Sequence, residues 1–307
     1  MSYKILFMGT PDFAVPVLKS IHESKHKIIE VYTQPPQKKN RGQKIKNSPI
    51  HELSNKLEIP VRCPISLTGS EELDHIKKIN PDIVIVVAYG KILPKSFFDL
   101  DKVLFLNIHA SLLPKWRGAA PIQRSIMNRD NETGISIMKI VPKLDAGPVL
   151  INSKIKIFQN TNYEELSYRM SKLGSKAILD ALKLIETSRA EFLAQDDSEA
   201  TYAPKIEKKE SKINWSEDAN IIIAKINAFH PNPGCWFELM GYRIKVVKAK
   251  VVINSKGKPG RILDKKFTIA CSKNAIQILE LKKEGKQKMS AIEFLKGNEI
   301  KIGQNLN

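Results

Sequence analysis

Short, wholly apolar runs recur through the first two hundred residues, and they constrain the fold more than any other feature of the chain. A strand with apolar side chains on both sides is typical of a parallel sheet that helices cover on both faces. Helix-like stretches, the first beginning near Asp12, alternate with these runs. This alternation predicts an α/β fold, a Rossmann-like doubly wound parallel sheet. The main runs are Ile5–Met8, Ile83–Ala88 and Val103–Leu106.

The last third of the chain has a different pattern. A long amphipathic stretch from Tyr163 to Ile185 predicts a helix that closes the first domain. Several short strand-like runs with turn signals follow a helix expected near 218–228, and they predict a C-terminal OB-like β-barrel. A chain of 307 residues favours two domains. We expect a catalytic domain at 1–189, a linker at 190–206 and a barrel domain at 207–307.

Composition narrows the protein class. Gly9-Thr10-Pro11 follows the first strand without G-x-G-x-x-G spacing, which argues against a dinucleotide site. The three cysteines show no C-x-x-C spacing, which favours a reducing compartment over a disulfide framework. The first residues lack the pattern of a signal peptide, and the longest apolar run is too short to cross a bilayer. We therefore expect a cytoplasmic protein that does not enter membranes.

Polar side chains follow the strand-like run 103–106. Asn107 and His109 come at its carboxyl end, where open α/β sheets bind their ligands, and on an extended chain they share one face. Asp145 lies in a loop after a second expected strand, Gly134–Ile140. Together these side chains are suited to acyl transfer to an amine. The amide and an imidazolium, favoured by a nearby carboxylate, would stabilise an oxyanion, and the carboxylate would collect the amine's proton.

Two other motifs are weighed and rejected. Ser111 near His109 suggests a Ser/His hydrolase, but the run Ser111–Pro114 lacks the glycines of a nucleophile elbow. The sequence from His22 to His26 matches the H-E-x-x-H zinc motif. We expect the helix to end near Ser24, so the two histidines would not share one helical face. No metal is expected.

The net charge of +18 indicates an acidic partner. Residues 205–307 contain 21 basic and 10 acidic side chains, so the smaller segment has the larger excess of positive charge. Residues 34–49 contain five basic side chains and no acidic one. A loop of this length inside a compact domain is usually functional or disordered. A solvated basic surface is the alternative to nucleic-acid binding.

The chain resembles the formyltransferases that use 10-formyltetrahydrofolate, over essentially its whole length. The Asn-x-His and Ser-Leu-Leu-Pro elements are shared across that family. The Arg-Gly-Ala-Ala-Pro-Ile-Gln-Arg element is similar to the branch that acts on tRNA. The segments that carry the resemblance are Lys4–Ala14, Val86–Pro94, Asn107–His109, Ser111–Pro114 and Arg117–Arg124.

The resemblance implies the fold described above, with the C-terminal domain binding tRNA, and transfer of a formyl group to methionine on initiator tRNA. It implies that Asn107, His109 and Asp145 are catalytic. It places Arg41 in an insertion that enters the acceptor end of the tRNA, with Lys44 adding attraction to phosphate. It implies folate contacts for a further group of residues, which are Ser111, Leu112, Leu113, Pro114, Val87, Tyr89 and Gly90. We expect a monomer.

The chain departs from the family pattern beside the expected acid. The family usually reads Leu-Asp-Thr-Gly-Asp, whereas this chain has Ala146 and Pro148 around Gly147. The missing hydroxyl and second acid put other support of Asp145 in question. Two alternatives stay open: formylation of a small amine such as glycinamide ribonucleotide or an amino sugar, and an RNA-binding protein with a degenerate folate pocket.

Overall fold

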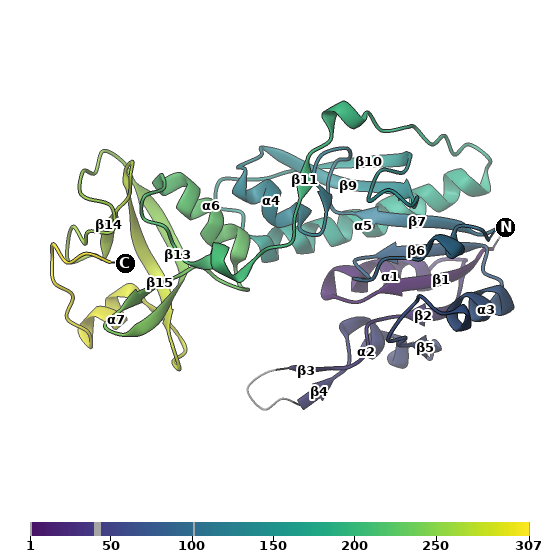
Figure 1. Ribbon diagram of the computed structural model, residues 1–307, viewed down its shortest axis with the longest axis horizontal. Helices are drawn as coiled ribbons and strands as arrows, with labels where there is room; N and C mark the ends of the chain where they lie inside the picture. The colour runs from purple at the N-terminus through teal and green to yellow at the C-terminus, as the bar shows by residue number, and fades with distance from the viewer. Residues whose placement is uncertain (1, 40–43, 101, 307) are drawn as a thin grey trace. The chain divides into compact units, whose positions relative to one another are not determined.

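The computed structural model describes residues 2–39, 44–100 and 102–306 (Figure 1). Contacts divide the chain into two compact units. The first comprises Met1–Gly118, Glu132–Ile155 and Ser167–Ala203, and the second comprises Ala119–Asn131, Lys156–Leu166 and Pro204–Asn307. The chain therefore passes into the second unit twice before its C-terminal third. Arg41 lies outside the described residues.

The first unit is built on a seven-stranded sheet in the order β10-β9-β7-β6-β1-β2-β5. The strands from β7 to β5 are parallel, which confirms the Rossmann-like prediction. Their bounds are β1 Lys4–Gly9, β2 Lys27–Tyr32, β5 Val61–Arg62, β6 Ile83–Val87, β7 Leu104–His109, β9 Glu132–Lys139 and β10 Val149–Lys156.

The sheet is mixed rather than wholly parallel, because β9 runs antiparallel to β7 with Ser136 opposite His109. A parallel neighbour would need a crossover back to the other end of the sheet. The connection from β7 instead contains α4 (Pro121–Met127), which belongs to the second unit. The chain thus re-enters the sheet beside the end of β7 that carries the candidate site.

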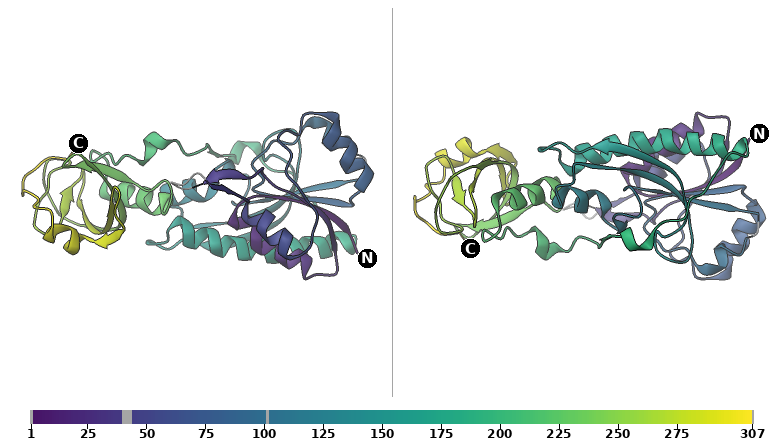
Figure 2. Two further views of the ribbon diagram at one scale, coloured as in Figure 1. Left: turned by 90° about the horizontal axis from the view of Figure 1, so that it is seen from below. Right: turned by 90° about the horizontal axis from the view of Figure 1, so that it is seen from above.

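Helices cover both faces of this sheet, with α3 on one side and α1 and α5 on the other (Figure 2). Alternation along the strands explains this arrangement: Leu6 and Met8 pack in one buried cluster with Ile76 of α3. On the other face α5 comes close enough that a Cβ on Gly174 would contact Ile108 at 3.3 Å. The helices of this unit are α1 Val15–His22, α2 Pro49–Lys56, α3 Ser70–Ile79 and, from Ser167 onward, α5 Tyr163–Glu186, with short 3-10 turns at Asp12–Ala14, Lys95–Phe97 and Asp197–Glu199.

The structure separates the two histidines of the zinc-like motif. Helix α1 ends at His22, slightly earlier than expected, and β2 begins at Lys27. His26 therefore lies between the two elements, where its Nδ1 accepts a hydrogen bond from the Tyr3 amide at 3.2 Å. The two rings do not occupy one face of a helix, which is the arrangement that a zinc protease requires.

The second unit contains a five-stranded antiparallel sheet in the order β12-β13-β15-β14, with β16 pairing β15. The expected run Gly260–Leu263 forms isolated bridges rather than a strand, and strand pairing does not close into a ring among the described residues. Its core includes edge-to-face contacts of Phe237 with Trp215 and Phe267. The elements are α6 Ala219–Phe229, β12 Trp236–Leu239, β13 Tyr242–Val252, β14 Thr268–Ala270, β15 Ala275–Lys283, β16 Lys288–Ser290, α7 Ala291–Lys296 and a 3-10 turn at Lys208–Ser211.

Most of the stretch that we expected to be a linker is packed against the first unit. Leu193 forms a β-bridge with Val149. Strand β11 (Tyr202–Ala203) pairs in parallel with β8 (Arg117–Gly118). The segment is thus hydrogen-bonded to the start of β10 and to β8.

Two short paired strands lie in the basic insertion, residues 34–49. Strand β3 (Gln37–Lys39) pairs with β4 (Lys44–Lys46), and the backbone of Lys44 lies opposite that of Lys39.

Among the described helices, none has the length and apolar character needed to cross a membrane.

Candidate active site

Strand β7 carries the first two candidate residues at its carboxyl end, as the sequence predicts. Asn107 and His109 are two residues apart and therefore share one face. His109 is buried, with 5% of its surface exposed, and Asn107 is partly exposed. Within the described part of the chain, the Asn107 amide has no hydrogen-bond partner. Its donors are therefore free for a ligand.

The His109 ring contacts two fixed groups. Nε2 lies 2.9 Å from the Trp116 carbonyl oxygen, and because a carbonyl only accepts, Nε2 carries the hydrogen. Nδ1 lies 3.7 Å from Asp145 Oδ2. This separation exceeds a hydrogen bond, and such contacts often shorten when substrate binds. The structure therefore brings the expected imidazole and carboxylate together and directs Nδ1 toward the acid.

Asp145 sits in the loop between β9 and β10, as expected. Its φ is 46°, in the left-handed region that aspartate adopts more readily than most residues. Its Oδ2 accepts a hydrogen bond from the Gly118 amide at 2.8 Å. Oδ1 has no hydrogen-bond partner within the described part of the chain. One carboxylate oxygen is thus fixed, and the other is available to a proton.

Three consecutive residues after the Ser-Leu-Leu-Pro turn organise the pair. Trp116 accepts from His109, Arg117 pairs with Gln195, and Gly118 donates to Asp145. Gly118 has a φ of 121°, and a Cβ there would lie 2.8 Å from the Ala203 carbonyl oxygen. Only glycine fits this backbone position. The pairing of β8 with β11 therefore fixes the segment that contacts both His109 and Asp145.

Two hydrogen bonds hold the Ser-Leu-Leu-Pro turn, one local and one to β9. The Ser111 hydroxyl donates to the Lys115 carbonyl at 2.5 Å, and Leu113 N donates to Ser136 Oγ at 2.9 Å. Leu112 and Pro114 remain partly exposed beside the end of β7. Because Ser111 is fully buried and does not bond to His109, it lacks the arrangement of a hydrolase nucleophile.

The other expected folate residues differ in exposure. Val87 and Tyr89 are buried, and burial raises the pKa of Tyr89, whose hydroxyl has no hydrogen-bond partner within the described structure. The Tyr89 carbonyl accepts from Thr10 at 2.9 Å and from Gln34 at 3.2 Å. Gly90 is exposed, with a φ of 83°. Of these three residues only Gly90 presents its surface to a ligand.

Sequence reasoning missed Gln195, Trp116 and Gly118 as contributors to the site. Gln195 lies in the polar stretch interpreted as a linker, and Trp116 and Gly118 act through backbone groups. A backbone contact leaves no signature in residue type. The glycine is the one signal that was available, because close backbone approach is a common reason for glycine.

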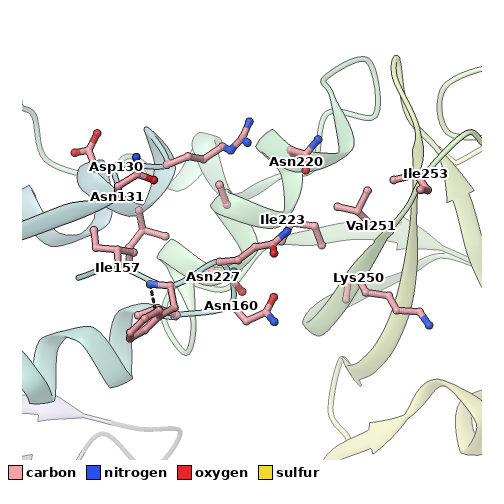
Figure 3. A pocket seen from close by; sticks show the side chains of 17 residues that line it. Asp130, Asn131, Ile157, Asn160, Asn220, Ile223, Asn227, Lys250, Val251 and Ile253 are labelled. Atoms are coloured by element: carbon pink, nitrogen blue, oxygen red, sulfur yellow. Dashed lines mark hydrogen bonds between the residues drawn. The ribbon is translucent and has the colours of Figure 1, made fainter. Parts of the chain in front are cut away.

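A cavity of about 520 Å³ lies in the second unit, between α4, the loop 157–161, α6 and β13 (Figure 3). Amide side chains, among them Asn131, Asn220 and Asn227, share its wall with Arg129 and Lys250. None of the expected catalytic or folate residues lines it. The cavity is thus separate from the candidate active site.

Comparison with known proteins decides the family. Residues 3–182 match the formyl transferase family, and residues 205–299 match the formyl transferase C-terminal domain. The chain belongs to the formyl transferase family. Asn107, His109 and Asp145 therefore lie within the range that matches the formyl transferase family, and the second unit contains the range that matches its C-terminal domain.

Curated relatives match along the full length of this formyltransferase. A methionyl-tRNA formyltransferase of Pelagibacter ubique is 47% identical and covers 100% of this chain and 99% of the relative. One from Paramagnetospirillum magneticum is 41% identical, with 98% coverage of both chains.

Solved structures with lower identity share the fold of the formyltransferase. An N-formyltransferase from Helicobacter canadensis, solved with folinic acid and dTDP-3-aminofucose, has a TM-score of 0.69 at 21% identity and covers 90% of this chain and 99% of the other. HypX from Aquifex aeolicus with tetrahydrofolic acid has a TM-score of 0.64 at 18% identity, with 96% of this chain and 47% of that chain covered. This chain spans about half the length of that protein.

Proposed function

We propose that this formyltransferase transfers the formyl group of 10-formyltetrahydrofolate to the α-amino group of methionine on initiator tRNA, in the cytoplasm and as a monomer. The observation that carries the proposal is 47% identity over both units to a relative named methionyl-tRNA formyltransferase. Two sugar-directed formyltransferase structures are 21% and 17% identical to this chain. The basic C-terminal segment supports an RNA substrate, because positive charge attracts phosphate. Binding of a small amine would not require such a segment.

We assign oxyanion stabilisation to Asn107 and His109. Attack by the amine on the formyl carbon places negative charge on the formyl oxygen. Nε2 of His109 is bonded to Trp116, and Nδ1 lies 3.7 Å from Asp145 Oδ2, too far for a hydrogen bond. The donors to the oxyanion are therefore the side-chain amide of Asn107 and Nδ1 of the protonated His109 ring. Donors aimed at such an oxyanion typically contribute a factor of about 10² to 10³ in rate.

We assign proton removal to Asp145. A peptide α-amino group has a pKa near 8, so part of it is unprotonated near neutral pH and attacks without a strong base. The proton that it loses on attack passes to Asp145 Oδ1, directly or through water, while Gly118 fixes Oδ2. The tetrahedral intermediate then collapses as the bond between the formyl carbon and the folate nitrogen breaks, and the proton collected by Asp145 passes to that nitrogen, so that tetrahydrofolate leaves. No covalent enzyme intermediate is needed.

10-formyltetrahydrofolate supplies the formyl group. Leu112 and Pro114 are partly exposed in the turn that follows β7, and Gly90 has an exposed backbone. Apolar side chains and exposed backbone are suited to a flat ring system. Leu113 and Ser111 are buried within that turn, and Val87 and Tyr89 are buried at the carboxyl end of β6. We propose that these residues form the folate site, with no metal involved.

The acceptor is tested by competition between substrates. We expect formylation of methionyl initiator tRNA, and little of glycinamide ribonucleotide or an amino sugar nucleotide, when each is incubated with 10-formyltetrahydrofolate and the full chain. The apparent KM for the tRNA should rise steeply with salt, because lysines and arginines displace counterions from phosphate. Preferred formylation of a small amine would contradict the proposal. Tight tRNA binding with no formylation would instead indicate a degenerate RNA-binding protein.

Arg41→Ala should weaken the use of methionyl-tRNA. An arginine fork both pairs with phosphate and stacks on bases, so we expect about a tenfold or larger fall in kcat/KM for tRNA. The KM for 10-formyltetrahydrofolate should stay within about threefold of its original value. Lys44→Ala is the comparison, with a smaller effect that added salt removes. A change confined to folate affinity would contradict the role of this insertion in RNA binding.

A further inference from the structure

Gln195 is bonded to the loop that carries Asp145. Its Nε2 lies 2.9 Å from the carbonyl oxygen of Asp145 and 2.7 Å from that of Gly147. Both hydrogens of one amide are therefore used on two carbonyls of a single turn. No other side chain of the described residues is shown to bond to both.

The orientation of the Gln195 amide is set by Arg117. Gln195 Oε1 accepts from Arg117 Nε at 3.0 Å and Nη2 at 2.8 Å. A guanidinium only donates and a carbonyl only accepts, so the amide has one orientation that satisfies all four contacts. The Arg117 side chain is fully buried, which makes its bidentate partner costly to remove.

Asp197 links the same arginine to the other end of the loop. Its Oδ1 lies 2.8 Å from Arg117 Nη1, as an ion pair outside hydrogen-bond geometry, and its Oδ2 contacts Lys143. Lys143 and Arg117 lower the pKa of Asp197, with Lys143 the larger cause. Asp197 is exposed, whereas Gln195 is only partly exposed and its amide bonds to the buried Arg117 side chain.

The loop needs such support because Asp145 has a left-handed backbone. A residue in that region costs on the order of 1 kcal/mol or more and persists only where its surroundings determine it. The distance of 3.7 Å between Asp145 and His109 depends on that backbone. Ala146 and Pro148 bring no side-chain donor to the loop.

We propose that Gln195, oriented by Arg117, is a positioning residue that fixes the Asp145 loop in its active geometry. The proposal rests on the proposed function, because it assumes that Asp145 removes the proton. Gln195 itself does not touch the substrate; it acts through the backbone of Asp145 and Gly147.

The test uses two substitutions that fail in different ways. Gln195→Met keeps the length but loses every hydrogen bond, whereas Gln195→Glu keeps the acceptors for Arg117 and loses both donors to the loop. We expect each to lower kcat by about 10- to 100-fold, since an error near 1 Å can cost that much, with KM for both substrates within about threefold. Hydrogen exchange at the amides of 143–149 should become at least about tenfold faster.

Thr187→Val is the matched control. Its hydroxyl also faces two backbone carbonyls, of Lys183 and Leu184, but at the exposed end of α5. We expect unchanged kcat and unchanged exchange in 143–149. This control separates loss of a side-chain bond in the same unit from loss of the bonds that position Asp145.

Asp145→Asn distinguishes the possible failures. The double variant with Gln195→Met and Asp145→Asn should have a kcat less than about twofold below that of Asp145→Asn alone. The two substitutions should not add, because each removes the same function, proton removal by Asp145. If Asp145→Asn alone keeps full activity, the assigned role of Asp145 is wrong and the positioning proposal falls with it. If Asp145→Asn is inactive while Gln195→Glu folds and keeps normal kcat and loop exchange, only the positioning proposal is overturned.

Discussion

His109→Ala should lower kcat for formylation by at least about a hundredfold. The substitution removes the imidazole that lies 3.7 Å from Asp145, and a lost oxyanion donor typically costs a factor of about 10² to 10³. The affinity for methionyl-tRNA should change little, because the ring is buried and bonded to Trp116 rather than exposed to a large ligand. Single-turnover formylation and tRNA binding measure the two effects separately.

The control for this substitution is His22→Ala, at an exposed position on α1 outside the site. It should leave kcat within about twofold of the original value. Removal of the buried His109 ring deletes its hydrogen bond to the Trp116 carbonyl, at a cost of about 0.5 to 1.5 kcal/mol in stability. Thermal unfolding is therefore measured together with turnover, so that a loss of stability is separated from a loss of catalysis. A folded His109→Ala protein with turnover within about threefold of the original would end the proposed mechanism.

The sequence predicted the part of the site that depends on local geometry. Asn107 and His109 share a face because side chains alternate along a strand, and the apolar run before them indicated where the strand ends. Asp145 was placed on a loop by its turn-forming neighbours. These are properties of a few consecutive residues, and they survive into the fold.

The distance from His109 to Asp145 was not predictable in the same way. It depends on contacts of Asp145 with Gly118 and Gln195, which are 27 and 50 residues away along the chain. Local pattern also does not determine strand direction. The Gly134–Ile140 run was recognised as a strand, but its antiparallel pairing with β7 follows from the path of the chain through α4.

The polar stretch after α5 shows how composition misleads. Its polar residues resemble a solvated linker, yet Gln195 and Leu193 are bonded to the Asp145 loop and to the start of β10. Polar side chains can satisfy backbone groups that would otherwise be left unpaired beside a site. A solvated linker and a segment that is hydrogen-bonded to the domain can therefore have the same composition and differ only in what they contact.

Gly147→Ala should affect both activity and stability. An added Cβ would lie 1.8 Å from the Lys139 carbonyl oxygen and 2.9 Å from its carbon, and these are backbone atoms at the end of β9. The loop must therefore move, taking with it the Gly147 carbonyl that Gln195 binds and the adjacent Asp145. We expect kcat to fall about a hundredfold and stability by about 1 to 3 kcal/mol.

The matched control is Gly297→Ala, since a Cβ there meets nothing within 4 Å and its φ of −108° suits any residue. It should melt and react as the original chain does. Single-turnover formylation and thermal unfolding of the two variants compare the same chemical change at a crowded and an open backbone. Normal turnover in Gly147→Ala would show that the loop can shift without loss of catalysis, and that the contact between Asp145 and His109 is not needed. Lost turnover with little loss of stability would instead localise the effect to the geometry of Asp145, because misfolding would lower both.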